Sequence, residues 1–394
     1  MTGVWGLAAL WLGLALIASL LSIWLRISTA LSEIVVGMIA QLIIGAAVGA
    51  AVLGTDESWV KFLSGLGAIV LTFLAGAELD PAVFRLKWKE ALSVGLASFF
   101  FPFLGCAAAA HYLLGWELMP SWLAGVAMST TSVAVVYAVM LEFGFNTTEY
   151  GKTILAACFV TDLGTVVALG LIFAPFTIKT LIFLGTGVVA FIVLPWITPR
   201  FFRLYGNRPS ELEAKFLLLC LLGMGALAAW ADSEAVLPAY LIGMVLAGTV
   251  GKDHALIRRL RTLTFGLLTP FYFIRAGSYV SIPDLVAAPI AFIIFLVVKV
   301  GTKIVGVYPV TKLFGSPNKE AMYTTLLMST GLTFGTISSL FGLSHGIIDQ
   351  AQYSSLVATV IASAVVPTVI ANAFYLPRHL LPRRESAAPD REAA

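Results

Sequence analysis

The chain has 394 residues, of which 59% are hydrophobic and only 11% are charged, and its mean hydropathy is +0.96. Soluble domains carry about 25% charged residues, so the composition excludes a soluble globular protein and indicates a protein of the lipid bilayer. The formal net charge of +3 says little about partners, and we expect no nucleic acid among them.

Apolar runs of about 20 residues, long enough to cross a bilayer as helices, recur along nearly the whole sequence. The runs are continuous rather than alternating, which favours helices over strands. The first run, WGLAALWLGLALIASLLSIWL, is too long for the core of a signal peptide and follows no basic stretch, so we expect a retained helix. We predict an all-α polytopic membrane protein with thirteen transmembrane helices, at residues 5–25, 31–54, 60–78, 90–114, 119–143, 150–173, 178–197, 212–231, 235–251, 262–279, 285–308, 320–342 and 351–375.

The basic residues predict the orientation of these helices. An odd number of spans places the two termini on opposite sides of the membrane. With the N-terminus outside, nearly all the loop arginines and lysines fall on one side, and only Lys61 and Lys179 fall on the other. The positive-inside rule therefore predicts an external N-terminus and a cytoplasmic tail at 378–394. The compact loops lead us to expect a bacterial inner membrane.

Two segments in the fifth and twelfth spans begin alike, MSTTSVAVV at Met128 and MSTGLTFGT at Met328. Both carry Ser, Thr or Gly where a lipid-facing helix would carry Leu, and the two spans run in opposite directions. Inverted-repeat transporters have matching helices that are broken at the membrane midplane. The alternative interpretation is that small residues serve only for close helix packing. The residues of the two predicted breaks are Thr130, Thr131 and Ser132, and Ser329, Thr330, Gly331 and Thr333.

Asp162, within FVTDLGTVVALGLI, is the acid that falls near the centre of a predicted span. A carboxylate at mid-bilayer costs about 2.5–3.5 kcal/mol, which indicates a functional role. Burial favours the protonated form and a nearby cation favours the ionised form, so one carboxyl group can hold a proton or an alkali cation in turn. The structural alternative is a protonated Asp162 bonded to another helix, or one paired permanently with a lysine. Because hard cations prefer oxygen ligands, the predicted cation and proton site comprises Asp162, Thr161, Thr130, Thr131 and Ser132.

Three basic residues lie inside predicted spans. Lys299 and Lys303 are four residues apart and so share a helix face; we expect them to compensate charge at the site, although Lys303 could instead extend toward cytoplasmic water. Arg275 lies about one turn from the outer end of its span. We expect it to form a structural ion pair with an acid of another helix, Glu78 or Glu142, with extension to the outer surface as the alternative.

Other chemistries find little support in the sequence. Cys106, Cys158 and Cys220 lie within apolar runs and form no CxxC pair, which argues against a disulfide framework or a zinc site. We expect no cofactor. An intramembrane aspartyl protease needs two facing acids and a serine type needs a deeply placed histidine, whereas all four histidines lie near helix ends. We therefore expect a protein that is not an enzyme.

Taken in order, the motifs of the chain resemble the monovalent cation:proton antiporter-2 family over nearly the whole length. This family includes bacterial Na⁺/H⁺ antiporters and the membrane part of K⁺ efflux systems. The motifs that carry the resemblance are FLAGAELDPAVFR at 73–85, STTSVAVVYAVMLEFG at 129–144, CFVTDLGTV around Asp162, PAYLIGMVLAG at 238–248, LTPFYFIRAG at 268–277, and STGLTFGTISSL after Met328.

The resemblance implies a homodimer in which a core domain moves like an elevator. It implies that Asp162 is the carrier carboxylate and that Lys303 holds the family's basic position. The dimerisation domain would comprise 1–89 and, beginning with a linker helix, 176–284; the core would comprise 90–175 and 285–377.

One departure from the family bears on the coupling of the two ions. Thr161 stands where electrogenic members carry a second aspartate, so we expect electroneutral exchange of one cation for one proton, with Na⁺ favoured over K⁺ or Li⁺. K⁺/H⁺ exchange is one alternative, and cation-coupled symport of an organic solute is another.

Overall fold

The computed structural model describes residues 2–25, 29–47, 53–77, 87–145, 148–173, 177–206, 208–231, 235–287 and 289–381. Within these ranges the regular secondary structure is entirely helical, with no strand. Nine helical spans in the same ranges are long and apolar enough to cross a membrane, and Thr29–Ile44 and Leu118–Ser129 are shorter apolar helices. Each of the thirteen predicted spans falls on a helix, so the predicted all-α polytopic fold is confirmed.

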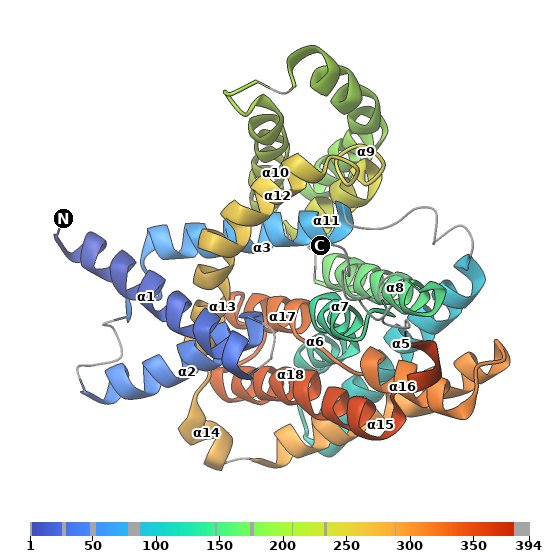
Figure 1. The fold of residues 1–394 in the computed structure, drawn as a ribbon. Coiled ribbons are helices and arrows are strands. Elements are labelled where there is room, and N and C mark those ends of the chain that lie inside the picture. The colour runs from blue at the N-terminus through green and yellow to red at the C-terminus, as the bar shows by residue number, and fades with distance from the viewer. Residues whose placement is uncertain are drawn as a thin grey trace, which may run out of the picture.

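The helices pack in the arrangement shown in Figure 1. Three π-helical segments, Ala109–Leu113, Thr264–Leu268 and Ala371–Tyr375, are each continuous with a neighbouring α-helix. The α-helices are α1 (Thr2–Leu25), α2 (Thr29–Ala47), α3 (Ser58–Ala77), α5 (Trp88–Ala108), α6 (Leu118–Ser129), α7 (Val133–Glu142), α8 (Glu149–Ile172), α9 (Ile178–Tyr205), α10 (Leu212–Trp230), α11 (Val236–Leu246), α12 (His254–Leu263), α13 (Thr269–Ser278), α14 (Ile282–Ala287), α15 (Pro289–Leu313), α16 (Asn318–Met328), α17 (Thr333–Ser344) and α18 (Gln350–Ile370).

Several predicted boundaries were wrong. The seventh and eleventh spans were predicted to end at residues 197 and 308, but α9 ends at Tyr205 and α15 at Leu313. The second span was predicted to reach residue 54, but the stretch from Leu53 is already outside the α-helix and leads into a turn. The tenth span was predicted to start at residue 262, whereas the helix starts at His254. Hydropathy missed that start because α12 carries three arginines, Arg258, Arg259 and Arg261.

Short polar side chains fix several helix starts by accepting hydrogen bonds from free backbone N–H groups. The Thr148 hydroxyl accepts from Gly151 N at 3.1 Å and begins α8. Asp349 and Gln352 form a capping box that begins α18. The Thr148 cap fixes where α8 begins, and Asp162 therefore lies near the middle of the 24-residue helix.

The helices fall into two packing groups (Figure 1). In the first, α5 packs on α6, α8 and α15, and α17 packs on α6 and α18. In the second, α11 packs on α3 and α9, and α13 packs on α2 and α3. The two groups correspond to the ranges that we assigned to a core domain and a dimerisation domain, and that assignment of roles stays a prediction.

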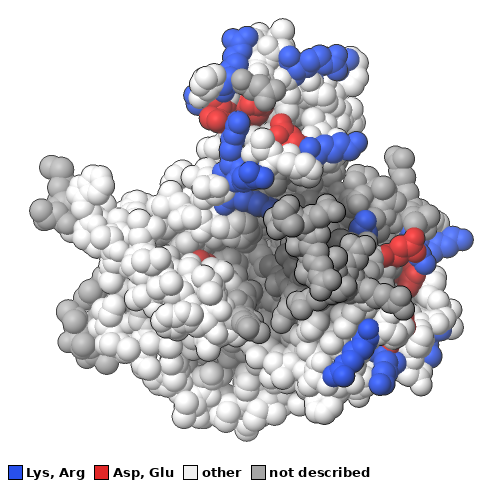
Figure 2. Space-filling view, in the orientation of Figure 1, with Lys and Arg blue, Asp and Glu red and all other residues white. Residues whose placement is uncertain are grey.

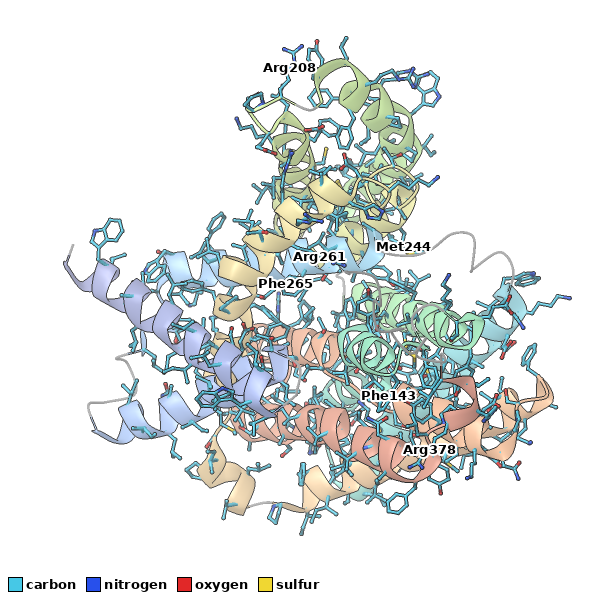
Figure 3. All side chains as sticks on the ribbon, in the orientation of Figure 1. Phe143, Arg208, Met244, Arg261, Phe265 and Arg378 are labelled. Carbon is cyan, nitrogen blue, oxygen red and sulfur yellow. The ribbon has the colours of Figure 1, made fainter. Side chains whose placement is uncertain are left out.

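Charged side chains are unevenly distributed over the surface. On the face shown in Figure 2, Lys and Arg gather over the lobe that contains α9, α10 and α12, and at the right-hand edge, whereas the part containing α1 is almost free of them. Arg208 lies at the far end of that lobe and Arg261 on α12 (Figure 3). This separation follows from the sequence, because the basic residues occur in loops on one predicted side of the membrane.

Glycines let helices of the second group approach closely. A Cβ atom placed on Gly67 of α3 would lie 2.6 Å from the Leu268 carbonyl oxygen, which is closer than real Cβ atoms come. By contrast, a Cβ on Gly65 of the same helix would meet no atom within 4 Å. Small residues at such contacts are typical of membrane helices.

We predict that Gly67→Ala lowers the free energy of unfolding by about 1–3 kcal/mol, because α3 must move away from the π-helical turn at Leu268. Thermal unfolding of the purified protein in detergent measures the effect. Gly65→Ala is the matched control and should leave stability unchanged or raise it by about 1 kcal/mol, since alanine favours helix over glycine. Equal melting temperatures for the two variants would contradict the close packing.

Candidate functional site

The fifth span is broken after α6, as the sequence predicts. Thr130 has an extended backbone, with φ −62° and ψ 152°, and residues 130–132 are not helical. The Ser129 hydroxyl donates to Val126 O at 2.8 Å, and the Thr130 hydroxyl donates to Ala127 O at 3.2 Å. These side chains hydrogen-bond carbonyls of their own helix, which stabilises the non-helical end.

The twelfth span is broken in the same way after α16. The Ser329 hydroxyl donates to Thr325 O and the Thr330 hydroxyl donates to Leu327 O, both at 2.8 Å. Gly331 follows within the break, and α17 begins at Thr333. In both segments, therefore, a serine and a threonine donate to carbonyls of the helix that ends at the break.

The two breaks cross and hydrogen-bond each other. The Thr131 hydroxyl donates to Met328 O at 2.8 Å, and the backbone N–H of Ser132 donates to Thr330 O at 3.0 Å. All four residues are buried. The prediction of an inverted pair of broken helices that cross is confirmed. We call this contact the crossing.

Lys303 of α15 reaches the crossing and bonds the end of α6. Its Nζ donates to Ser98 Oγ at 2.6 Å, to Ser129 O and Thr131 Oγ1 at 3.0 Å each, and to Thr130 O at 3.5 Å. An ammonium group has three donors, so this one is fully used. A cation at the carboxyl end of a helix is also stabilised by the helix dipole. Extension of Lys303 toward cytoplasmic water, the alternative above, is not what the structure has, because its side chain is fully buried.

Asp162 lies on the face of α8 that meets both breaks. One turn before it, Cys158 Sγ donates to Met328 Sδ at 3.6 Å, at the end of α16. One turn after it, Thr165 Oγ1 lies 3.2 Å from Ser129 Oγ, at the end of α6. Residues 158, 162 and 165 share a helix face, so Asp162 faces the crossing between these two contacts.

The carboxylate of Asp162 is only 1% exposed, and its Oδ1 has no hydrogen-bond partner. Among the ion pairs of the described residues, none joins Asp162 to Lys303 or Lys299. Lys303 is nevertheless near enough to interact with Asp162 electrostatically. The permanent lysine pair that we considered as a structural role is therefore absent from this conformation.

The neighbouring threonine points elsewhere. Thr161 Oγ1 lies 3.2 Å from Gly95 O on α5 and 3.1 Å from Ala157 O on its own helix. Its hydroxyl hydrogen can therefore be donated to either carbonyl. In this conformation Thr161 ties α8 to α5, and its role as a cation ligand stays a prediction.

Lys299 is the second buried lysine, and its environment differs from that of Lys303. It is fully buried, and its Nζ has no hydrogen-bond partner. Gly331 lies directly beside it, because a Cβ on that glycine would collide with the ammonium nitrogen. The structure therefore brings Lys299 to the second break and Lys303 to the first.

Arg275 is bound to the loop before α3. Its Nε donates to Thr55 O at 2.9 Å, and its Nη2 donates to the Tyr279 hydroxyl at 3.0 Å. That hydroxyl donates in turn to Asp56. A hydrogen bond from Lys61 lowers the pKa of Asp56 below its ordinary value, so the carboxylate stays charged at the outer end of this network.

The acids that we expected to pair with Arg275 are not seen beside it. Glu78 lies outside the described residues, and so does the side chain of Glu142. The pairing of Arg275 with either acid stays a prediction. The contacts of Arg275 with residues 55 and 279 already give it a structural role.

Sequence reasoning missed several polar groups near the crossing. Ser98 gave no clear signal, whereas Thr165 follows Asp162 by three residues, and that spacing on one helix face was the available signal. Tyr240 of α11 donates from its buried hydroxyl to Phe159 O at 3.0 Å and so links the two helix groups. Glu33 of α2 is 1% exposed; its place near the start of a predicted span made it resemble a helix-end charge.

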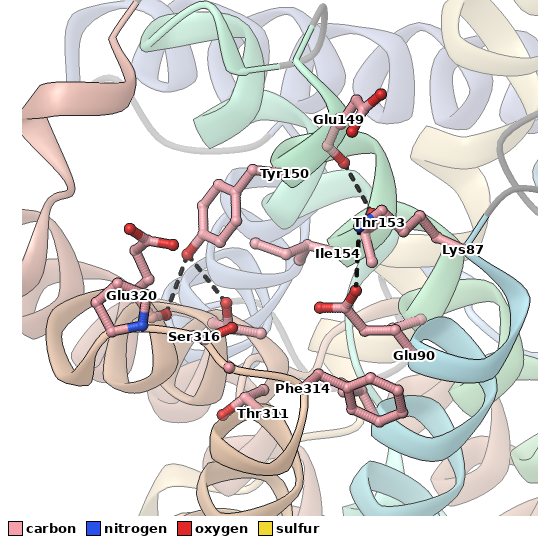
Figure 4. A pocket seen from close by; sticks show the side chains of 15 residues that line it. Lys87, Glu90, Glu149, Tyr150, Thr153, Ile154, Thr311, Phe314, Ser316 and Glu320 are labelled. Carbon is pink, nitrogen blue, oxygen red and sulfur yellow. Dashed lines mark hydrogen bonds and ion pairs between the residues drawn. The ribbon is translucent and has the colours of Figure 1, made fainter.

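A pocket of about 260 Å³ opens at the ends of α5, α8 and α16 (Figure 4). Glu90, Glu149 and Glu320 line it together with Lys87. Tyr150 crosses it, with its hydroxyl donating to Glu320 O at 3.1 Å or shared with Thr324 Oγ1 at 2.9 Å. Along α5, α8 and α16 its lining extends as far as Val94, Ala157 and Thr324. One turn further along their helices stand residues 98, 161 and 328, so the pocket approaches the crossing.

Comparisons with known proteins agree with this geometry. The family model described as "Sodium/hydrogen exchanger, transmembrane" matches residues 12–374. The chain is 25% identical over 352 residues to the probable Na⁺/H⁺ antiporter 3 of Methanocaldococcus jannaschii, covering 86% of this chain and 89% of that protein. It is also 25% identical over 354 residues to the Na⁺/H⁺ antiporter of Enterococcus hirae, covering 86% and 91%.

A solved structure has the same fold. The sodium proton antiporter MjNhaP1 from Methanocaldococcus jannaschii superposes with a TM-score of 0.71 over 94% of this chain and 96% of that one. The sequence identity is 14%, so this likeness concerns the fold alone.

We predict that Lys303→Met lowers the free energy of unfolding by about 2–4 kcal/mol, because it leaves several buried acceptors without a donor. The melting temperature in detergent, measured at neutral pH, reports the loss. Lys299→Met is the matched control on the same helix face and leaves no bonded group unpaired, so it should change stability far less. A similar loss in both variants would show that the hydrogen bonds of Lys303 have no special weight.

Proposed function

The chain belongs to the transmembrane sodium/hydrogen exchanger family, and from this membership we propose that it exchanges a monovalent cation for H⁺ across a lipid bilayer, with Asp162 as the site that the two ions occupy in turn. The observation that carries the proposal is the buried Asp162 Oδ1, which faces the crossing with no partner. A buried polar atom without a partner is costly, and a proton or a cation would each satisfy it.

The environment of Asp162 supports alternating occupancy. Lys303 makes its hydrogen bonds with Ser98 and the end of α6, so it does not neutralise the carboxylate by direct contact. It is still near enough to favour the ionised form, while burial favours the protonated form. The two effects oppose each other, which is the condition for a group that exchanges a proton for a cation.

Oxygen atoms around the crossing suit a bare alkali cation. The Thr130 hydroxyl donates to a backbone carbonyl, which leaves its oxygen lone pairs available as ligands, whereas the Thr131 oxygen also accepts from Lys303 and keeps one lone pair for a cation. Hard cations prefer such oxygen donors together with a carboxylate. An organic solute would need a wider space, whereas these residues are at most 1% exposed. The site therefore favours ion exchange over symport of an organic solute.

The acidic pocket is the proposed route from the cytoplasm. Carboxylates at Glu90, Glu149 and Glu320 attract cations to its mouth. The gathering of Lys and Arg on one part of the surface (Figure 2) supports a cytoplasmic C-terminus and an external N-terminus. We place the protein in a bacterial inner membrane as a homodimer whose first helix group moves against the second like an elevator.

Electroneutral exchange follows from the single carrier acid in this proposal. Asp162 alternates between one proton and one cation, so each loaded form has the same charge. Na⁺ is the proposed cation, because the names of both curated relatives specify Na⁺. K⁺/H⁺ exchange is the alternative with the same residues and the same ratio.

We predict that Asp162→Asn reduces exchange to the level of protein-free vesicles, because an amide can neither release a proton nor neutralise a cation. The measurement is the pH change inside proteoliposomes after addition of Na⁺, K⁺, Li⁺ or Rb⁺, and the same series ranks the cations. Glu33→Gln, which removes another buried acid, is the matched control and should keep exchange. Transport that persists in Asp162→Asn with altered cation dependence would favour a symporter.

We also predict that the exchange rate is independent of membrane potential. Proteoliposomes clamped at several potentials with a K⁺ gradient and valinomycin, and driven by Na⁺, provide the measurement. A form that carries an extra charge would gain or lose about 2.3 kcal/mol per 100 mV, which changes rates strongly. A rate that scales with the potential rules out the one-to-one ratio while leaving Asp162 as the carrier.

A further inference from the structure

The two lysines of α15 are in opposite situations although they lie one turn apart. Lys303 has four oxygen atoms within hydrogen-bonding distance. Lys299 is equally buried and has none. The contrast needs a physical reason, because an ammonium ion inside a protein is stable only when it is paired or hydrogen-bonded.

The space beside Lys299 contains oxygen atoms that it does not use. Thr130 Oγ1 and Ser363 Oγ border Gly331 on the same side as the lysine nitrogen. Both hydroxyls donate to carbonyls of their own helices, Ala127 O and Val360 O, so their lone pairs are free to accept. The amine therefore lies near two hydroxyl oxygens at the second break without a hydrogen bond to either.

Burial without a hydrogen-bond partner favours a neutral amine at Lys299 in this conformation. On its own helix the nearest charge is Lys303, and two ammonium ions at this spacing repel each other. On the packed helix α5, the titratable group that interacts with Lys299 is the Cys106 thiol. Asp162 of α8 interacts with Lys303. The other titratable groups of the elements against α15, such as Glu90, His111, Glu320 and Tyr353, lie toward the ends of those elements.

We propose, resting on the exchange function above, that Lys299 is a second proton-binding residue of the transport site, neutral when the cation binds and protonated in an arrested form. Protonation would put a second ammonium next to Lys303 and repel a cation that approaches the crossing. The form with protons on both Asp162 and Lys299 would carry one more positive charge through the bilayer than the cation-loaded form. That form does not cross the bilayer, so protonation of Lys299 slows exchange at acidic pH.

Cation competition with protons tests this proposal. The apparent KM for Na⁺ is measured in proteoliposomes of the full-length protein from mildly alkaline to acidic pH. Because two protons must leave for each cation that binds, a plot of log KM against pH should approach a slope of about −2 at acidic pH. In Lys299→Met only the proton of Asp162 competes, and the slope should be no steeper than about −1.

Two further variants control for indirect effects. Lys299→Gln removes the charge but keeps a polar side chain, and it should behave as Lys299→Met does. Val297→Met changes an exposed position on the same helix and should keep the steep slope. Faster exchange than the unmodified protein at acidic pH is expected for both Lys299 variants.

The outcomes separate this proposal from the proposed function. A slope of about −1 in the unmodified protein overturns the role of Lys299 without any variant, because one competing proton then suffices. Equal slopes in the unmodified protein and the Lys299 variants also overturn it, as does a folded but inactive Lys299→Met or Lys299→Gln. Exchange that persists in Asp162→Asn instead overturns the proposed function itself.

Discussion

The structure depends on how a helix can end inside a membrane. Each break leaves backbone carbonyls with no water to bond, and such groups are tolerated only with internal partners. At the first break the partner is the Lys303 ammonium, which bonds Ser129 O and Thr130 O. At the second it is the first break itself, through Thr131 and Ser132. The polar centre of the protein is therefore a requirement of the fold as well as a place for ions.

This constraint explains why Asp162 remains unpaired. In a simple apolar core the nearest lysine would bind the carboxylate and hold it permanently. Here Lys303 already has acceptors at the end of α6, so its charge acts on Asp162 without a direct hydrogen bond. The carboxylate is stabilised at a distance and its oxygens stay open. A helix end thus serves as a competing partner that prevents a permanent ion pair.

How much the sequence could predict varies with the kind of signal. Hydropathy located every span, and the Ser/Thr/Gly clusters located both breaks, because those residues have local conformational preferences. Hydropathy misplaced the start of α12, because its arginines lower the hydropathy of a continuous helix. At the site, Asp162 and both lysines were found by their cost in an apolar run. The sequence does not show which break each lysine contacts, nor that Thr161 points toward Gly95 O. Both depend on how a helix is rotated about its axis. A helix that is buried on all sides has no apolar periodicity from which that rotation can be predicted. Tyr240 lies within the motif at 238–248, but nothing in that motif indicated its hydrogen bond to α8.

The hydrogen bond from Tyr240 to Phe159 O joins α11 to α8 at a buried position. A buried phenol needs an acceptor, and the next carbonyl on the same face of α8 lies one turn away, about 5.4 Å along the axis. Any sliding of α8 past α11 must therefore break this bond and can restore it only after a whole turn. The contact therefore favours discrete positions of α8 relative to α11, one helical turn apart, and disfavours every position between them.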